Sequence, residues 1–358
     1  MKHYQVAVYP GDGIGIDVTA ETMKVLRAAE SRCGFRIEAT EMPWGCAWAA
    51  HHGGHVAPPD FLDTLRPFDA VFLGALGMPS AIPDHISLVP LIRMRQVFDQ
   101  YVCLRPARLL EGAACPLTGR EPGDIDLVVV RENSEGEYTA TGGSFRVNTP
   151  DEVSVQTAIH TRKGVERILR YGFDLARRRR CRLTMATKSN ALNYSMVMWD
   201  RVLASVAPDY PDVVSDKVHV DALAMLFVRA PQRFDVVVAS NLFGDILSDL
   251  AGAVVGSLGL APSANINPER IYPSLFEPVH GSAPDIAGKG IANPLAAIRS
   301  AALMLDFLGE ADAAAVIETA VTDAVRDGRV LTPDLGGHAT TPAVGDDVAA
   351  RVAVVKPL

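Results

Sequence analysis

Short apolar runs that alternate with helix-like patterns constrain the fold of this chain more than any other feature. We expect strands within residues 5–9, 70–73, 125–130, 153–159, 183–186 and 236–239. Helical periodicity predicts helices over residues 17–31, 162–178, 190–206, 221–228, 242–256, 294–308 and 312–327. Strands that alternate with helices are typical of a sheet covered by helices. The order therefore predicts an α/β fold with a largely parallel sheet.

The length of the chain indicates two domains, because 358 residues exceed the usual domain size of about 50–250 residues. Residues 104–124 and 257–294 lack clear periodicity and are rich in Gly and Pro. Irregular segments of this length are usually functional or link domains. Because they bracket the middle of the chain, we expect a discontinuous domain of residues 1–103 and 257–358 around a domain of residues 104–256.

The net charge of −8 excludes a general nucleic-acid binder, because an acidic surface repels phosphate backbones. The one basic block, residues 177–182, is interpreted as a charged helix end, with an RNA contact as the alternative. The five cysteines show no zinc-type spacing, so we expect reduced thiols. Neither a signal peptide nor a membrane-length apolar run is found in the sequence, which predicts a cytoplasmic protein without a membrane partner.

A glycine-rich segment, GDGIG at residues 11–15, follows a predicted strand and opens a predicted helix. Its spacing is G-x-G-x-G, whereas the dinucleotide-binding fingerprint is G-x-G-x-x-G. We therefore interpret it as a tight turn that needs glycine for positive φ angles. Its backbone amides could still face a ligand.

Two carboxylates four residues apart, Asp245 and Asp249, give the strongest chemical signal. On a helix they share one face and repel each other. A cation between them removes this repulsion, and oxygen-only ligands favour Mg²⁺ or Mn²⁺. The alternative is a helix with two solvated aspartates. Asp221, at the start of a predicted helix, is either a third ligand or a residue that caps free backbone amides.

Three arginines form a second group: Arg95 precedes the segment FDQYVCLRP, Arg105 lies within it, and Arg131 ends an apolar run. Ligands bind at the carboxyl ends of parallel strands, and guanidinium groups recognise carboxylates. We expect a small anionic substrate there, with surface ion pairs as the alternative. Lys188 follows another predicted strand and could act as a base, and Tyr138 could donate a proton.

These segments together resemble the β-decarboxylating dehydrogenases, the family of isocitrate, 3-isopropylmalate, homoisocitrate, tartrate and D-malate dehydrogenases. The resemblance runs through YPGDGIG, LRP, VVVREN, ATKSN, DALA, ASNLFGDILSDL and EPVHGSAPDIAGKGIANP, of which the last two are highly specific. FDQYV, PGDID and APSANINPER are most similar to the tartrate and D-malate branch. The resemblance implies the isopropylmalate-dehydrogenase-like fold, with two α/β domains and no Rossmann fold.

The resemblance also implies roles for the substrate-facing residues. Arg95, Arg105 and Arg131 match the family's arginines that bind the substrate carboxylates. Tyr138 matches the tyrosine that protonates the enolate.

Lys188 matches the family's base, which works with Asp221 through water. Asp221, Asp245 and Asp249 match the ligands of Mg²⁺ or Mn²⁺, and the family allows a further monovalent cation such as K⁺. Lys188 and Asp221 would reach into the active site of the partner subunit. The resemblance therefore implies a homodimer with shared active sites.

The residues that match the family's cofactor contacts are His280, Gly281, Ser282, Ala283, Asp285, Ile286 and Asn293. His280 would lie against the adenine. Asp285 matches the acid that accepts the ribose hydroxyls in NAD-dependent members, and its charge would repel a 2′-phosphate, so NAD is the expected cofactor. Residues 1–103 and 257–358 would then be the cofactor-binding domain, and residues 104–256 the substrate, metal and dimerisation domain.

The expected reaction is the NAD- and metal-dependent oxidation and decarboxylation of a short 2-hydroxy diacid: D-malate to pyruvate and CO₂, tartrate, or both. A 3-isopropylmalate dehydrogenase is the alternative, since Leu88, Val89 and Leu91 could form an apolar pocket, although the polar Asp84 and His85 favour a short hydroxylated acid.

Several departures from the branch surround the substrate-selecting segment. They are Met78, Cys103, Ala191 and a shortened stretch at residues 89–94, and they allow a member specialised for an unusual 2-hydroxy acid. A non-catalytic metabolite-binding paralogue is a further hypothesis. It predicts the loss of key residues, whereas Lys188, Tyr138 and both aspartates of the pair are retained.

Overall fold

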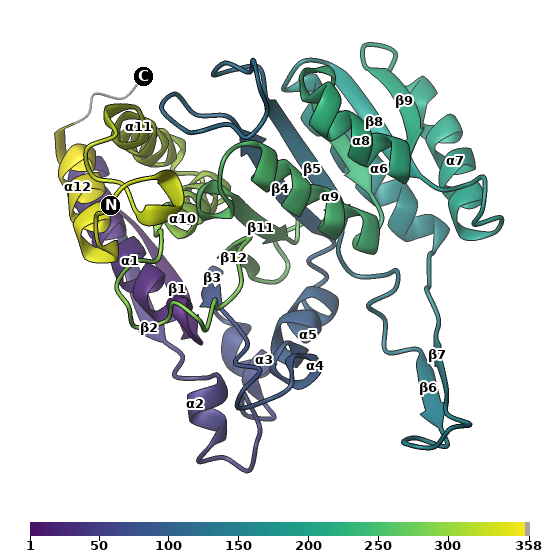
Figure 1. Ribbon diagram of the computed structural model, residues 1–358, viewed down its shortest axis with the longest axis horizontal. Coiled ribbons are helices and arrows are strands. Elements are labelled where there is room, and N and C mark those ends of the chain that lie inside the picture. Colours follow the sequence, from purple (N-terminus) through teal and green to yellow (C-terminus); the bar gives the residue numbers. More distant parts are fainter. Residues whose placement is uncertain (355–358) are drawn as a thin grey trace.

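A single sheet of ten strands runs through the computed structural model, which describes residues 1–354 (Figure 1). From one edge to the other, the strands are β2 (Phe35–Glu41), β1 (Lys2–Gly11), β3 (Ala70–Ala75), β12 (Ser274–Pro278), β11 (Pro262–Ile266), β4 (Val102–Arg108), β5 (Asp126–Glu132), β10 (Val236–Ala239), β8 (Arg182–Thr187) and β9 (Val214–His219). Adjacent strands are parallel except at β12–β11, β11–β4 and β4–β5. The predicted α/β fold with a largely parallel sheet is confirmed.

Helices cover both faces of the sheet, which explains why its central strands are apolar without alternation. Beside one half of the sheet lie α1 (Ile14–Cys33), α10 (Leu295–Leu308), α11 (Ala311–Asp327) and α12 (Thr341–Val354). On the other half, α6 (Arg162–Arg177) and α7 (Ser195–Val206) pack on one face, and α8 (Val220–Arg229) and α9 (Asn241–Val254) on the opposite face. Four short helices, α2 (Cys46–Ala49), α3 (Phe61–Leu65), α4 (Asp84–Ser87) and α5 (Val89–Val97), complete the first half.

A two-stranded hairpin projects away from the body of the molecule (Figure 1). It consists of β6 (Gly142–Phe145) and β7 (Val153–Gln156), and every residue of the two strands is exposed. Its exposed side chains include the apolar Phe145, Val153 and Val155. A hairpin of this kind is at best marginally stable by itself in water, so it needs a packing partner.

The predicted elements are present, but the sequence patterns missed several others. Strands β11 and β12 lie inside residues 257–294, which were expected to be irregular, so that expectation is wrong. Both strands have only five residues and are buried along their whole length, so they show no period-two pattern. The helix expected from residue 190 begins at Ser195, because Ala191 and Leu192 form a turn on the carbonyl of Lys188.

The basic block at residues 177–182 is the end of α6 and the turn that follows, as predicted. Arg177 pairs with Asp212, and Arg179 pairs with Asp126 and Asp235. The glycine-rich turn also has the expected positive φ angles, 72° at Gly11 and 55° at Gly13.

The predicted division into two domains stays a prediction, because the sheet is continuous across it. Strands β2, β1, β3, β12 and β11 come from the two ends of the chain and lie side by side, whereas β4 spans the expected boundary at residues 103 and 104. At this point β11 and β4 pair through three residues of each strand. No helix within residues 1–354 combines the length and apolar character needed to cross a bilayer.

Candidate active site

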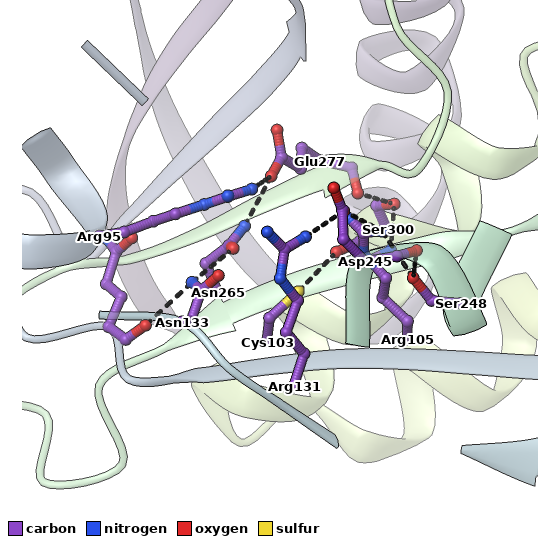
Figure 2. A network of polar contacts seen from close by, with 12 residues as sticks. Arg95, Cys103, Arg105, Arg131, Asn133, Asp245, Ser248, Asn265, Glu277 and Ser300 are labelled. Atoms are coloured by element: carbon purple, nitrogen blue, oxygen red, sulfur yellow. Dashed lines mark hydrogen bonds and ion pairs between the residues drawn. The ribbon is translucent and has the colours of Figure 1, made fainter. Parts of the chain in front are cut away.

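A cavity of about 460 Å³ lies where the two halves of the sheet meet. Eight of the residues predicted from the sequence to have a catalytic or binding role line it: Arg95, Arg105, Arg131, Tyr138, Asp245, Asp249, His280 and Gly281. They come from α5, β4, β5, α9 and the segments that follow β5 and β12, so distant parts of the chain converge there. Figure 2 shows the polar network at its centre.

Strand pairing places Arg105 and Arg131 on the same face of the sheet. Strands β4 and β5 are antiparallel, with Cys103 opposite Arg131, and Arg105 lies two residues further along β4. Helix α9 packs closely over this face because Gly244 has no side chain. A Cβ atom at Gly244 would lie 2.6 Å from the Cβ of Arg131. This close approach brings the next residue of α9, Asp245, to the guanidinium groups.

Asp245 is the centre of the polar network (Figure 2). Its Oδ1 accepts hydrogen bonds from Arg131 and, at 3.2 Å, from Arg105. Its Oδ2 accepts a hydrogen bond of 2.8 Å from the hydroxyl of Tyr138. Burial alone would favour the protonated acid, but the charges of Arg131 and Arg105 outweigh it and lower the pKa of Asp245. Asp245 is therefore a carboxylate at neutral pH.

Asp249 lies one helical turn further along α9, as its spacing from Asp245 predicts. Its Oδ1 lies 3.4 Å from Arg105, but its side chain is 57% exposed. Partial burial and the nearby charge of Asp245 raise the pKa of Asp249, although Arg105 opposes the shift. The two carboxylates thus compete for the same arginine, and they offer the oxygen donors that Mg²⁺ and Mn²⁺ prefer.

The hydroxyl of Tyr138 keeps its proton at neutral pH. Burial and the negative charge of Asp245 raise the pKa of Tyr138 above its ordinary value. The Arg131 guanidinium carbon lies 5.2 Å from the centre of the Tyr138 ring, so this cation also holds the ring in place. A protonated hydroxyl fixed at the cavity wall can serve as a proton donor.

Arg95 is paired with a carboxylate that the sequence analysis did not identify. Its Nη2 lies 3.0 Å from Oε1 of Glu277, which also accepts a 2.8 Å hydrogen bond from Asn265 (Figure 2). Glu277 lies in β12, inside the segment that was expected to be irregular, and lines the cavity. The signal for it was a single acid in the apolar run SLFEP.

An apolar wall faces these charges. Leu88, Leu91 and Ile92, from α5 and the residue before it, line the cavity. Asp84 and His85 are exposed and do not line this cavity, so their part in a polar approach of the substrate stays a prediction. Val89 is also outside this cavity and faces a separate hollow near His55 and Phe61.

Lys188 and Asp221 lie outside the cavity of their own chain and contact each other. The Lys188 Nζ atom is 2.7 Å from Oδ1 of Asp221. Lys188 follows β8, and Asp221 follows β9 at the outer edge of the sheet (Figure 1). Within residues 1–354 no three His, Cys, Asp or Glu side chains are grouped so that they could hold a metal ion. One chain therefore brings Asp245 and Asp249 together, but not Asp221.

The segment matched to cofactor binding follows β12 and borders the cavity. The Nε2 atom of His280 is buried without a hydrogen-bond partner, and burial lowers the pKa of His280, so its ring is neutral. Extra Cβ atoms at Gly281, Gly288 and Gly290 would meet open space, and Asp285 is exposed. An unpartnered ring nitrogen beside open backbone fits a ligand with a polar planar ring, such as a nicotinamide dinucleotide.

Other residues of this segment have structural partners. The carbonyl of Ser282 accepts a 2.8 Å hydrogen bond from the amide of Ile14. This amide of the glycine-rich turn is therefore paired within the chain and does not face a ligand. Asn293 is buried, donates to Asp334 and accepts from the amide of Leu295. Ala283, with a φ of 38°, and Ile286 pack partly against the main core.

Comparison with known proteins places this geometry in context. The sequence profile of the isocitrate/isopropylmalate dehydrogenase family matches residues 5–348. The chain is 53% identical over 356 residues to a D-malate dehydrogenase (decarboxylating) of Escherichia coli, covering 97% of this chain and 98% of that protein. It is 50% identical over 359 residues to a tartrate dehydrogenase/decarboxylase of Pseudomonas putida, covering 98% of each. The crystal structure of an isocitrate dehydrogenase from Methylococcus capsulatus, 38% identical, superimposes with a TM-score of 0.89 over 98% of this chain and 100% of that one.

The opposite pKa shifts of the two α9 aspartates predict opposite effects on stability. A lowered pKa stabilises the folded state above the ordinary pKa of the acid, and a raised pKa does the reverse. At pH 7, without metal or substrate, Asp245→Asn should lower the free energy of unfolding by roughly 1–3 kcal/mol, since Arg131 and Arg105 lose an ionic acceptor. Asp249→Asn should raise it. Urea denaturation at a fixed protein concentration measures both, and shifts of the same sign would contradict the assignment.

Proposed function

The chain belongs to the isocitrate/isopropylmalate dehydrogenase family and is an oxidoreductase that acts on a CH–OH group, and on this premise we propose that it oxidises and decarboxylates D-malate, tartrate or both. NAD is the proposed hydride acceptor. The observation that carries the proposal is the convergence of three buried arginines, a protonated tyrosine and two aspartates on one cavity.

The arginines favour a substrate with two carboxylates. Burial together with the charges of Arg105 and Arg95 lowers the pKa of Arg131, because the three guanidinium groups repel one another. An anionic ligand relieves this repulsion, and guanidinium groups bind carboxylates through paired hydrogen bonds. A short 2-hydroxy diacid supplies two such groups and would take over from Asp245 as a partner of the arginines.

The metal is proposed to be Mg²⁺ or Mn²⁺, held by Asp245 and Asp249 together with Asp221 of the partner subunit. Such an ion would polarise the 2-hydroxyl and stabilise the charge of the enolate. The acidic helix face and its oxygen-only donors support this assignment.

NAD is proposed to bind along the segment from His280 to Asn293, within the domain formed by residues 1–103 and 257–358. The unpartnered Nε2 atom of His280 supports a ring at this position. The exposed carboxylate of Asp285 would accept ribose hydroxyl groups and repel a 2′-phosphate, which favours NAD over NADP.

The chain's own residues move the protons. We assign Lys188 of the partner subunit as the base that would remove the proton of the 2-hydroxyl, and bound NAD would supply the acceptor for the hydride of C2. The 2-keto acid then loses its β-carboxylate as CO₂. Tyr138, which keeps its proton at neutral pH, protonates C3 of the enolate. For D-malate the products are pyruvate, CO₂ and NADH.

A homodimer with shared active sites is proposed because Lys188 and Asp221 form an ion pair outside the cavity of their own chain. The surface next to them is apolar: Met225 and Val228 on α8 and Ile246 on α9 are each more than 40% exposed. The projecting hairpin exposes further apolar side chains. Exposed apolar side chains of this kind support an interaction surface.

The apolar wall of Leu88, Leu91 and Ile92 favours a second candidate substrate, 3-isopropylmalate. An isopropyl group packed against these side chains would gain hydrophobic free energy that malate cannot. The same wall would suit an unusual 2-hydroxy acid with a small apolar substituent.

The substrate is tested by NADH formation in the presence of Mn²⁺. We expect the largest kcat/KM with D-malate or a tartrate isomer, a smaller value with 3-isopropylmalate, and a smaller value for NADP⁺ than for NAD⁺. A larger kcat/KM for 3-isopropylmalate would establish the second candidate instead. The absence of turnover with every acid, isocitrate included, would overturn the proposed substrate class.

Shared active sites are tested by mixing two inactive variants, Lys188→Ala and Tyr138→Phe. If each site combines Tyr138 of one chain with Lys188 of the other, a hybrid dimer has one intact site and one doubly substituted site. After dissociation and random reassociation, activity should return to roughly a quarter of the wild-type value. The unmixed variants are the controls. No recovery in hybrids of confirmed composition would contradict the sharing of sites.

A further inference from the structure

We infer that Asp200 is a positioning residue that fixes the chain segments carrying Lys188 and Asp221 relative to each other. The inference rests on the proposed catalytic role of this pair. Asp200 contacts neither the Lys188 ammonium group nor the Asp221 carboxylate, so it would act through the backbone that carries them.

One oxygen of Asp200 holds the end of strand β8. Asp200 lies in α7, and its Oδ1 accepts a hydrogen bond of 2.8 Å from the hydroxyl of Thr187. Thr187 is the last residue of β8 and directly precedes Lys188. The nearby side chain of Ser189, which directly follows Lys188, helps to lower the pKa of this carboxylate. Asp200 thus holds the residue that directly precedes Lys188.

The other oxygen of Asp200 holds strand β9. The ammonium group of Lys217, in β9, binds Oδ2 of Asp200. Strand β9 is the outermost strand, hydrogen-bonded only to β8, and most of its residues are exposed or half-buried. Apart from β8, this edge strand is covered on one face by α8, against which Val218 packs. Helix α8 follows β9 at once and carries Asp221 in its first turn.

The charge of Asp200 suits this role. Its side chain is only 14% exposed, and burial by itself would favour the protonated acid. Hydrogen bonds from Lys217 and Thr187, together with the nearby Ser189, reverse this preference and lower the pKa of Asp200. At neutral pH the group is therefore a carboxylate that accepts from both strands at once.

Catalysis is sensitive to this placement, because a displacement of about 1 Å of a catalytic group can cost about a hundredfold in rate. Lys188 and Asp221 lie in two different segments that are joined by their 2.7 Å ion pair, by the β8–β9 ladder and by the packing of α8 against β8. Asp200 adds a polar connection that reaches both strands. Without it, the base would sample positions from which it cannot reach the substrate.

The test compares three substitutions that remove different parts of the connection. Asp200→Ala removes all of it, Thr187→Val removes the β8 contact, and Lys217→Met removes the β9 contact. With D-malate we expect kcat to fall roughly 10- to 100-fold in Asp200→Ala and less in the two others. The KM for NAD⁺ should stay within about twofold of the wild-type value, because the placement of the base changes the rate and not the binding of the cofactor. Asp212→Ala, which breaks the exposed Arg177–Asp212 ion pair near the same edge, is the matched control and should leave kcat unchanged.

Hydrogen–deuterium exchange gives a second measurement that does not depend on turnover. In Asp200→Ala the amides of residues 187–191 and 217–222 should exchange faster, while those of the central strands β5 and β10 should not change. Wild-type kcat in the folded variant, or unchanged exchange at both segments, would overturn the inference. If the wild-type protein turned over none of the acids, the proposed function would fail, and exchange alone would decide whether Asp200 holds the two segments.

Discussion

Buried positive charge is the constraint on which the rest of the site depends. Arg95, Arg105 and Arg131 are each less than 10% exposed, and a buried cation is tolerated only with an anionic partner. Asp245, Glu277 and Asp249 are the anionic partners within the chain, and Ser248 takes a further hydrogen bond from Arg105. Asp245 and Asp249, which would hold a metal, are therefore engaged by arginines that would hold the substrate. A dianionic acid and a divalent cation would together satisfy both sets of charges.

The order of strands in the sheet explains how these charges meet. Arg105 and Arg131 lie on neighbouring strands at the middle of the sheet, and Glu277 comes from β12, two strands away from β4. Lys188 and Asp221 follow β8 and β9 at the opposite edge from β2 and do not line the cavity of their own chain, which is why we propose that a second subunit supplies them. The same topology thus accounts for the cavity, for the proposed dimer and for the need to anchor an edge strand through Asp200.

Part of this arrangement could be predicted from the sequence. The spacing of Asp245 and Asp249 placed both on one helix face, and the position of Arg131 at the end of an apolar run placed it near the site. The ion pair between Arg131 and Asp245 could not be predicted from spacing, because it joins residues 114 positions apart. Glu277 was missed because β12 is short and fully buried, which leaves neither strand alternation nor helical periodicity. The polar role expected of Asp84 and His85 stays a prediction, because α4 carries them outside the cavity, while α5 and the residue before it present leucine and isoleucine to the cavity.

We infer that substrate and metal bind cooperatively. The substrate would replace the aspartates as the partner of the arginines, and the metal would replace the arginines as the partner of the aspartates. Equilibrium binding of Mn²⁺ to the metal-free protein, followed by electron paramagnetic resonance with and without D-malate, tests it most directly. The account predicts that D-malate tightens Mn²⁺ binding about 5- to 150-fold, the usual range of coupling between two sites. It also predicts that Arg131→Met removes most of this coupling. A Mn²⁺ dissociation constant that is the same with and without the acid would contradict the account.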